Sequence, residues 1–331
     1  MTAMDWSWLA TLSLLWGSGT FFNVVAVHDM APDTVVFCRV ALAAMIVGLV
    51  VRARGVGLLP GRKEVVPFVV LGVVNTVVPY SLIAWGAQRL DSGVAGILLA
   101  TTPMFTVLIA HVATGDERLG ISTMTGIGLG LAGVLLILGG HPLALAGGGF
   151  AALALLGAAL SYGVACVFGR TLRDIPPLKL AWGQLAVATL LMIPILALPG
   201  AAGDLRWSWP AIGAVMALAL LSTAARSLAY FHVLARVGST NTSLVGFLIP
   251  VSSLALGVLV LDEPLGLAHL AGLGAIAAGL AVVDGRFPTA RPSWARFPAR
   301  KPRSRRRPLA DPRGHRASAR YDGPPRQAVP W

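Results

Sequence analysis

Arg226 is the residue whose type and position most directly suggest chemistry, because it lies in the middle of a long apolar stretch. It stands ten residues before Arg236, which places it about 15 Å from the end of a helix that rises about 1.5 Å per residue. An arginine at the centre of a membrane-spanning helix costs about 2.5–3.5 kcal/mol and normally faces a wet cavity or a partner. Tyr230 and Ser222, four residues to either side, share its face. Two interpretations stay open: a cationic, aromatic-flanked wall that binds a carboxylate or phosphate, or an arginine bound to backbone carbonyls.

Other polar and aromatic residues lie at depth in apolar stretches, where an unpaired polar group is costly. Some of them must therefore line water or a substrate. They are Trp16, Asn23, Asn75, Tyr80, Trp85, Tyr162 and Gln184. Trp85 also fits ordinary packing or an interfacial belt. Arg39 lies only about five residues inside its stretch, so its side chain either lines the same cavity or reaches the membrane surface.

Two acidic pairs and one histidine are candidates for proton coupling. Asp116-Glu117 and Asp262-Glu263 each stand just before an apolar stretch, where carboxylates cap the free N–H groups of a helix start. Pro264 fits the first turn of such a helix, so capping is the favoured interpretation. Histidine changes charge near neutral pH, but His232 lies about 200° around the helix from Tyr230. A packed or interfacial His232 is therefore favoured.

The motifs of common enzymes are absent from the sequence. It has no H-E-x-x-H, no G-x-S-x-G and no glycine-rich loop ending in Gly-Lys. The six histidines show no metal-ligand spacing, and Cys38 and Cys166 indicate neither a disulfide framework nor a zinc site. We therefore expect no enzyme, no metal and no cofactor, and a transport process driven by a gradient. A channel has no filter motif in its favour.

Composition indicates the environment of these residues. With 331 residues, of which 56% are hydrophobic and 12% charged, the chain has too few charges to cover a soluble globule. Its apolar segments each approach the length of about 20 residues that a spanning helix needs. There are ten: 7–27, 34–51, 65–86, 92–112, 120–139, 148–169, 180–198, 210–234, 240–261 and 266–283. The sequence thus predicts an all-α integral membrane protein with ten transmembrane helices.

The second half of the chain repeats the first. Much of the stretch 81–138 recurs at 227–284: Ser81-Leu82 returns as Ser227-Leu228, 146 positions later. The repeated marks, in order, are Pro103 and Pro250, the two acidic pairs, and the glycine sets Gly126, Gly128, Gly133 and Gly272, Gly274, Gly279. A repeat of this length decides the architecture. We predict five-helix repeats at 7–140 and 148–284, and because five is odd, the second copy enters the membrane inverted.

Orientation follows from the positive-inside rule. With a cytoplasmic N-terminus, the external loops carry only Arg89 and Arg206. The cytoplasmic loops carry nine basic residues: Arg52, Arg54, Arg62, Lys63, Arg118, Arg170, Arg173, Lys179 and Arg236. Both termini are therefore expected in the cytoplasm, with the protein in a bacterial-type inner membrane.

The segment 285–331 has a different composition. It holds thirteen Lys and Arg, two Asp and nine Pro, and so carries +11 of the net charge of +12. Such a sequence cannot bury enough apolar surface to fold alone, and we expect a disordered cytoplasmic tail. Its densest basic run, 300–320, lacks interleaved aromatics, which disfavours nucleic acid as a partner. Anionic lipid is the expected contact.

Trp16-Gly17-Ser18, Pro32 followed by Arg39, and the twice-occurring Pro…Asp-Glu…Gly-x-Gly pattern resemble EamA-type members of the drug/metabolite transporter superfamily over residues 7–284. The resemblance implies an inner-membrane carrier with two five-helix repeats around a central cavity, which moves small metabolites outward. It also implies that an arginine at the position of Arg39 lines this cavity. Gln184 stands at the equivalent place in the second repeat, which argues against a strictly two-fold symmetric binding scheme.

The repeated glycines and prolines also have structural interpretations. The glycines predict close helix packing, within one protomer or between two, so a homodimer stays open. Pro103 and Pro250 are candidate hinges or tolerated bends.

Two deep arginines without an acidic residue at comparable depth favour a zwitterion or weak acid as substrate. Residues expected to bind it are Arg226, Tyr230, Arg39, Trp16, Asn75, Tyr80, Tyr162 and Gln184. We expect a secondary transporter of a small metabolite, such as an amino acid or another carboxylate. A multidrug efflux carrier of the same fold is the first alternative, and a non-transporting intramembrane enzyme or a structural membrane protein is the second.

Overall fold

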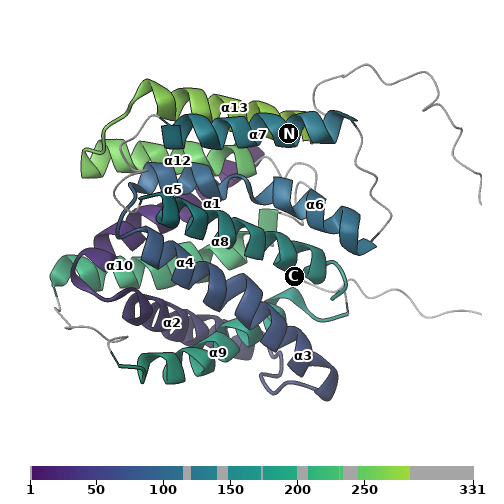
Figure 1. The fold of residues 1–331 in the computed structure, drawn as a ribbon. Coiled ribbons are helices and arrows are strands. Elements are labelled where there is room, and N and C mark those ends of the chain that lie inside the picture. The colour runs from purple at the N-terminus through teal and green to yellow at the C-terminus, as the bar shows by residue number, and fades with distance from the viewer. Residues whose placement is uncertain are drawn as a thin grey trace, which may run out of the picture. The chain divides into compact units, whose positions relative to one another are not determined.

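The computed structural model describes residues 2–114, 121–139, 148–172, 174–199, 208–230, 232–233 and 245–283 (Figure 1). Every regular element within these ranges is helical. The first half contains α1 (Ala3–Asp29), α2 (Pro32–Ala53), α3 (Arg62–Leu71), η1 (Gly72–Val77), α4 (Val78–Gly86), α5 (Ser92–Leu99), α6 (Thr102–Thr114) and α7 (Ile121–Gly139). The second contains α8 (Gly148–Gly169), α9 (Pro177–Leu196), α10 (Trp209–Ala219), η3 (Leu220–Ala225), α12 (Val245–Leu261) and α13 (Leu267–Val283).

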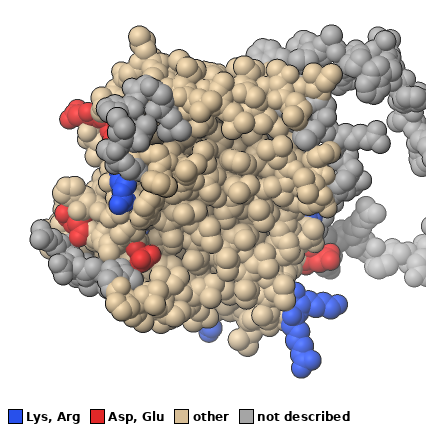
Figure 2. Space-filling model, viewed as in Figure 1, with Lys and Arg blue, Asp and Glu red and all other residues tan. Residues whose placement is uncertain are grey.

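These helices confirm the predicted all-α membrane fold. Among the described residues, seven helices are long and apolar enough to cross a membrane. Three shorter apolar helices, Met124–Ile137, Leu248–Leu261 and Leu267–Val282, fall in the other predicted segments. Figure 2 shows charged side chains gathered at the left and right edges of one face, with its middle almost free of them. The predictions for Asp116-Glu117, Arg118, Arg236 and the tail lie outside the described residues.

Helix starts follow ordinary capping rules. Thr2 and Asp5 form a reciprocal capping box at the start of α1, in which the backbone N–H of Thr2 donates to Asp5 Oδ2 at 2.7 Å. Pro32 and Pro177 begin α2 and α9, where a missing N–H costs nothing. Ser208 caps α10 and also bonds the carboxylate of Asp29 at the end of α1. The ends of these helices are therefore set locally by their own residues.

Helices from the two halves of the chain pack against each other. α1 lies along α12, α8 along α4 and α6, and α2 along α9. Gly17 and Gly163 lie 146 positions apart. Gly17 allows α1 to approach α12, and Gly163 allows α8 to approach α6. A β-carbon at Gly17 would lie 2.9 Å from the Ile249 carbonyl oxygen, and one at Gly163 would lie 3.1 Å from the Thr106 nitrogen. The same kind of close approach therefore recurs in both repeats.

The repeated glycines of α7 and α13 also pack within the chain. These two helices lie side by side in Figure 1. A β-carbon at Gly279 would lie 2.5 Å from the Gly126 carbonyl oxygen. Gly128 and Gly274 have nothing within 4 Å. Of the two sequence interpretations, packing inside one protomer is therefore the one that applies to Gly126 and Gly279.

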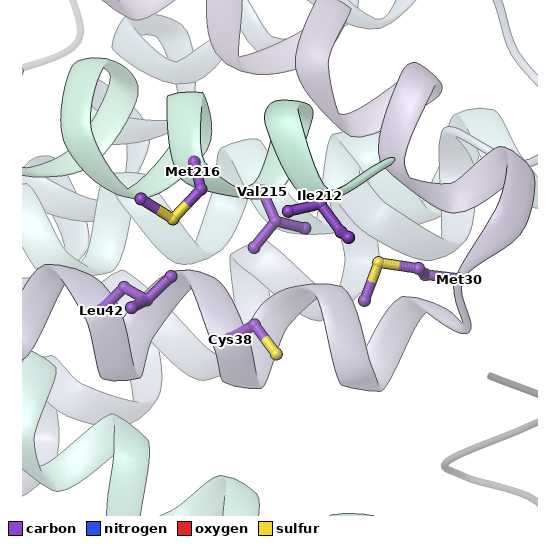
Figure 3. Close-up of a pocket in the computed structure, with 6 residues that line it drawn as sticks. All are labelled: Met30, Cys38, Leu42, Ile212, Val215 and Met216. Atoms are coloured by element: carbon purple, nitrogen blue, oxygen red, sulfur yellow. The ribbon is translucent and has the colours of Figure 1, made fainter. Parts of the chain in front are cut away.

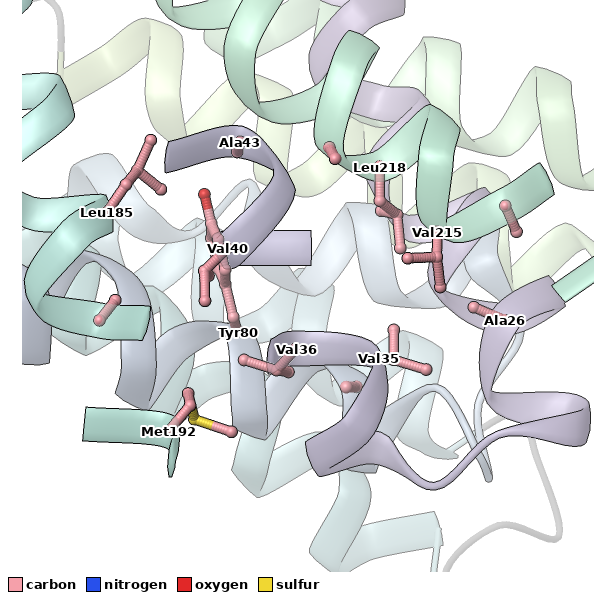
Figure 4. Packing of buried hydrophobic residues seen from close by; sticks show 14 of the residues in the cluster. Ala26, Val35, Val36, Val40, Ala43, Tyr80, Leu185, Met192, Val215 and Leu218 are labelled. Atoms are coloured by element: carbon pink, nitrogen blue, oxygen red, sulfur yellow. The ribbon is translucent and has the colours of Figure 1, made fainter. Parts of the chain in front are cut away.

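The largest apolar core lies between the halves. It joins α2 residues such as Val36, Val40 and Val47 with Leu185 of α9 and Leu218 of α10. Figure 4 shows part of this cluster, including Tyr80 of α4. Because residues of both repeats form one core, the van der Waals packing within it holds both halves together.

Two π-helical turns interrupt the third and eighth predicted segments. η1 runs directly into α4 and η3 directly into the turn that carries Arg226. Side-chain hydroxyls bind carbonyls beside or within these turns: Ser161 Oγ donates to the Val74 carbonyl at 2.6 Å, and Thr223 Oγ1 to the Leu218 carbonyl at 2.8 Å. π-Turns of this kind frequently occur at functional sites, and these two precede Tyr80 and Arg226.

Candidate functional site

Arg226 faces aromatic residues of other helices rather than backbone carbonyls. Its Nη2 donates to the Tyr80 hydroxyl at 3.4 Å, which is long for a hydrogen bond. Its guanidinium carbon lies 4.7 Å from the centroid of the Trp16 ring. Its Nε is buried and has no hydrogen-bond partner. This combination leaves the Nε–Nη2 edge of the guanidinium without a strong hydrogen bond.

Arg39 lies inside the helix bundle with only 5% of its surface exposed. Its Nε donates to Thr223 Oγ1 at 2.9 Å, and its guanidinium carbon lies 3.8 Å above the Tyr80 ring. A desolvated cation–π contact of this kind contributes about 2 kcal/mol or more. The alternative in which Arg39 reaches the membrane surface is therefore wrong. Both hydrogen-bonding and stacking partners hold it in place.

Tyr80 thus stands between two cations, one on its ring face and one on its hydroxyl. Within the described part of the chain, neither guanidinium forms an ion pair with a carboxylate. A buried charge without a counter-charge is costly. The centre of the bundle is consequently electropositive and suited to an anionic group.

Asn75 and Gln184 form a second polar contact between the halves. Asn75 Nδ2 donates to Gln184 Oε1 at 2.8 Å. Gln184 holds the place in the second repeat that Arg39 holds in the first, and each reaches a π-turn of the other half: Arg39 bonds η3 at Thr223, and Gln184 bonds η1 at Asn75. The departure from arginine at Gln184 therefore keeps the contact and removes its charge.

Tyr162 and Tyr230 lie in the surroundings of Arg226. Tyr162 is half-buried against two of the apolar clusters and lies within electrostatic reach of Arg39, Arg226 and Tyr80. Tyr230 packs with Trp16 against the cluster around Leu9 and also feels the charge of Arg226. These rings therefore form apolar walls near the guanidinium.

A row of buried hydroxyls on α1 was missed from the sequence. Ser13, Ser18 and Thr20 pair with Ser252, Ser222 and Ser253 respectively. Ser253 Oγ also donates to the Ser92 carbonyl at 2.8 Å. The 146-shifted positions on α8 are Ala159, Val164 and Cys166, so this polar row belongs to one half only. The seven-residue spacing of Ser13 and Thr20 was the available signal.

Glu263 caps a helix of the other repeat, which corrects the sequence interpretation. Its two carboxylate oxygens accept the backbone N–H groups of Ser92 at 2.6 Å and Gly93 at 3.0 Å, at the start of α5. The start of α13 is bound instead by His269, whose Nδ1 accepts from the Gly266 N–H at 3.1 Å. Glu263 therefore caps a helix, as predicted, but the helix is α5 and not α13, which follows it in the sequence.

Other predicted candidates lie away from the Arg226 cluster. Trp85 is about one-third exposed and carries the Arg89 guanidinium carbon 4.5 Å above its ring, as expected at an interface. His232 is exposed, with its ring 4.6 Å from that of Trp8. Pro103 is the second residue of α6, just after the break between α5 and α6. Pro250 lies inside α12.

A separate pocket lies between α2 and α10 (Figure 3). Its lining is apolar apart from the Cys38 thiol and consists of Met30, Cys38, Leu42, Ile212, Val215 and Met216. With no charged group and only a weakly hydrogen-bonding thiol, this pocket is poorly suited to orienting a polar substrate.

One known family matches each half of this chain separately. A family model described as the EamA-like transporter family matches residues 6–139 and again residues 149–283. Together the two matches cover most of the chain.

Related chains carry similar descriptions. The uncharacterized transporter YoaV of Bacillus subtilis is 24% identical over 274 residues, covering 82% of this chain and 94% of its own. The uncharacterized inner membrane transporter YedA of Escherichia coli is 24% identical over 284 residues, covering 83% and 89%. An uncharacterized protein of Pseudomonas aeruginosa is 32% identical over 276 residues, covering 79% and 89%.

A solved structure has the same fold. A chain titled "Crystal structure of protein" matches with a TM-score of 0.61 at 18% identity, covering 85% of this chain and 96% of that one. At this identity the likeness concerns the fold alone.

Proposed function

This chain belongs to the EamA-like transporter family, and from this premise we propose that it is a gradient-driven exporter of small carboxylate-bearing metabolites. Membership of the family and the apolar helices support an integral membrane transporter. The proposal adds the substrate class, the direction and the residues that bind the substrate.

The main support for a carboxylate substrate is the Nε–Nη2 edge of the Arg226 guanidinium. A carboxylate binds a guanidinium best through two parallel N–H···O bonds. Nε and Nη2 form such a pair of donors on Arg226; the first has no partner and the second has only the long contact to Tyr80. A carboxylate at this edge would satisfy both donors and neutralise one of two buried positive charges.

The aromatic residues around Arg226 suit the rest of such a molecule. Trp16 lies under the guanidinium, and Tyr162 and Tyr230 are half-buried nearby. A ligand with a carboxylate at one end and an apolar or aromatic body would bury that body against these rings. Asn75 and Gln184 satisfy each other and are proposed to line the cavity without carrying charge.

A cationic drug suits this site poorly. It would lose hydration and meet Arg39 and Arg226, with no carboxylate among the described residues near them to compensate. This observation disfavours multidrug efflux of cations, which is the competing function for the same fold.

Alternating access of two inverted repeats is the proposed mechanism. It is supported by contacts that recur at a 146-residue offset, such as those of Gly17 and Gly163 across the two halves. Contacts between halves at Arg39 and Gln184 would be remade as one half moves against the other.

The test uses purified protein in proteoliposomes with a matched pair of probes, phenylacetate and phenethylammonium, which differ mainly in the sign of the charge. We expect transport of phenylacetate, with a rise in KM in Arg226→Lys and near-complete loss in Arg226→Gln, because lysine keeps the charge but lacks the planar fork. Arg89→Gln is the matched control, since this arginine stacks on Trp85 outside the site. Preferential transport of phenethylammonium, unaffected by Arg226→Gln, would overturn the proposal.

A further inference from the structure

We infer that the Tyr80 hydroxyl occupies, in the unloaded site, the place on Arg226 that one oxygen of the substrate carboxylate takes. The inference rests on the proposed function and adds a specificity-determining residue to it. Tyr80 is then a competitor of the substrate rather than one of its ligands.

The geometry of the Tyr80–Arg226 contact supports replacement. The hydroxyl meets Nη2 at 3.4 Å, whereas a charge-assisted bond to a carboxylate is typically about 2.7–2.9 Å. A phenol oxygen is neutral, and it reaches only one of the two donors on that edge while Nε stays without a partner. A carboxylate offers two charged oxygens to the same edge and would displace the hydroxyl.

Tyr80 itself is held from its other side. Arg39 stacks on its ring at 3.8 Å and is tied to η3 through Thr223, and only 3% of the Tyr80 surface is exposed. The ring therefore cannot follow Arg226 when a ligand arrives. Arg226 is half-buried, and it is the partner that changes its contact.

The contact also joins equivalent positions of the two repeats. Tyr80 precedes Ser81 and Arg226 precedes Ser227, so the pair is separated by the repeat offset of 146 residues. Replacing the phenol by a carboxylate would break a direct polar contact between the two halves. Substrate binding would thereby loosen the halves at the site where they must move.

The chemistry of the empty carrier gives this arrangement a second role. Without substrate, a guanidinium with no acceptor at all would be strongly unfavourable in the interior. The Tyr80 hydroxyl partly satisfies it, so that the empty carrier can return across the membrane. A tighter acceptor, such as a carboxylate side chain, would exclude the substrate.

The decisive variant is Tyr80→Phe, which removes the hydroxyl and keeps the ring under Arg39. In equilibrium binding to detergent-purified protein, we expect the Kd of phenylacetate to fall by about 3- to 10-fold, the worth of one net hydrogen bond. In proteoliposomes we expect the KM of Tyr80→Phe to fall without a rise in kcat. In the wild type the Tyr80 hydroxyl takes the place of the departing carboxylate and so assists release of the substrate, and the variant lacks this assistance. Arg89→Gln should leave the Kd unchanged.

The outcomes separate this inference from the proposed function. If Tyr80→Phe raises the Kd while Arg226→Gln abolishes binding, Tyr80 is a direct ligand and the inference is wrong, although the carboxylate site stands. If Arg226→Gln leaves phenylacetate binding intact, the proposed function itself is wrong.

A second measurement needs no change at Tyr80. The chain has four tyrosines, so 3-fluorotyrosine labelling gives four fluorine resonances, which are assigned by replacing each of the other three with phenylalanine. Phenylacetate should shift the Tyr80 resonance and phenethylammonium should not. A Tyr80 resonance that stays unchanged at saturating phenylacetate would overturn the inference.

Discussion

Gly133 of α7 and Gly272 of α13 approach so closely that a β-carbon on Gly133 would lie 2.7 Å from the Gly272 carbonyl oxygen. A β-carbon on Gly272 would lie 2.8 Å from that of Gly133. These distances are shorter than side-chain carbons accept, and the neighbouring atoms are backbone. The contact joins the fifth predicted helix of one repeat to the fifth of the other.

Gly133→Leu should therefore destabilise the protein strongly, because the two backbones would have to separate. Gly128→Ala is the matched control on the same helix, since its β-carbon meets open space and alanine favours a helix by about 1 kcal/mol. Thermal unfolding in detergent, followed by size-exclusion of the soluble fraction, checks both. A Tm for Gly133→Leu equal to that of Gly128→Ala would contradict the close packing.

The cap of α5 by Glu263 gives a second prediction. Glu263→Ala removes the acceptor of two backbone N–H groups, and we expect a loss of about 1–3 kcal/mol in stability. Asp262→Gly is the control, because Asp262 has a φ of 53° that glycine adopts without strain. The Tm of Asp262→Gly should equal or exceed that of the wild type. A drop in Tm for Asp262→Gly, with none for Glu263→Ala, would show that Glu263 does not act as this cap.

The Asn75–Gln184 contact is suited to a double-mutant cycle. Gln184→Met keeps the shape of the side chain but leaves Asn75 Nδ2 without an acceptor, which costs about 1–3 kcal/mol for a buried group. Asn75→Leu alone leaves Gln184 unpaired in the same way. The double variant should recover part of the loss, which measures the coupling of the pair. Losses that simply add would mean that the two residues act independently.

The orientation in the membrane is a prediction of the loop charges and of the odd number of helices per repeat. Reporter fusions after residues 30 and 145 should read as external, and fusions after 58 and 175 as internal. The Lys179–Glu64 ion pair, at 2.6 Å, joins the starts of α9 and α3 and requires these two ends to lie on one side. Fusions at 58 and 175 that read on opposite sides would contradict both arguments.

The sequence alone determined the class of the protein and the extent of its helices. The segment predicted at 148–169 coincides with α8, and the one at 65–86 lies within the continuous helical stretch Arg62–Gly86. These features depend on neighbouring residues, since each helix in a bilayer must satisfy its own backbone hydrogen bonds. The duplication was equally visible, because it is a property of the sequence itself. Arg226, Arg39 and Tyr80 stood out because polar groups are rare in apolar helices.

Only the tertiary structure decided which of these residues meet. Tyr80 contacts Arg226 across 146 residues, Arg39 bonds Thr223 across 184, and Glu263 caps Ser92 across 171. The hydroxyl row of α1 gained its meaning only from the serines of α12 and η3 that lie opposite. The pattern of a single helix specifies its apolar face, but its rotation and partners come from the packing of all helices together. In this protein that packing interleaves the two repeats, so each half supplies the contacts that the other half lacks.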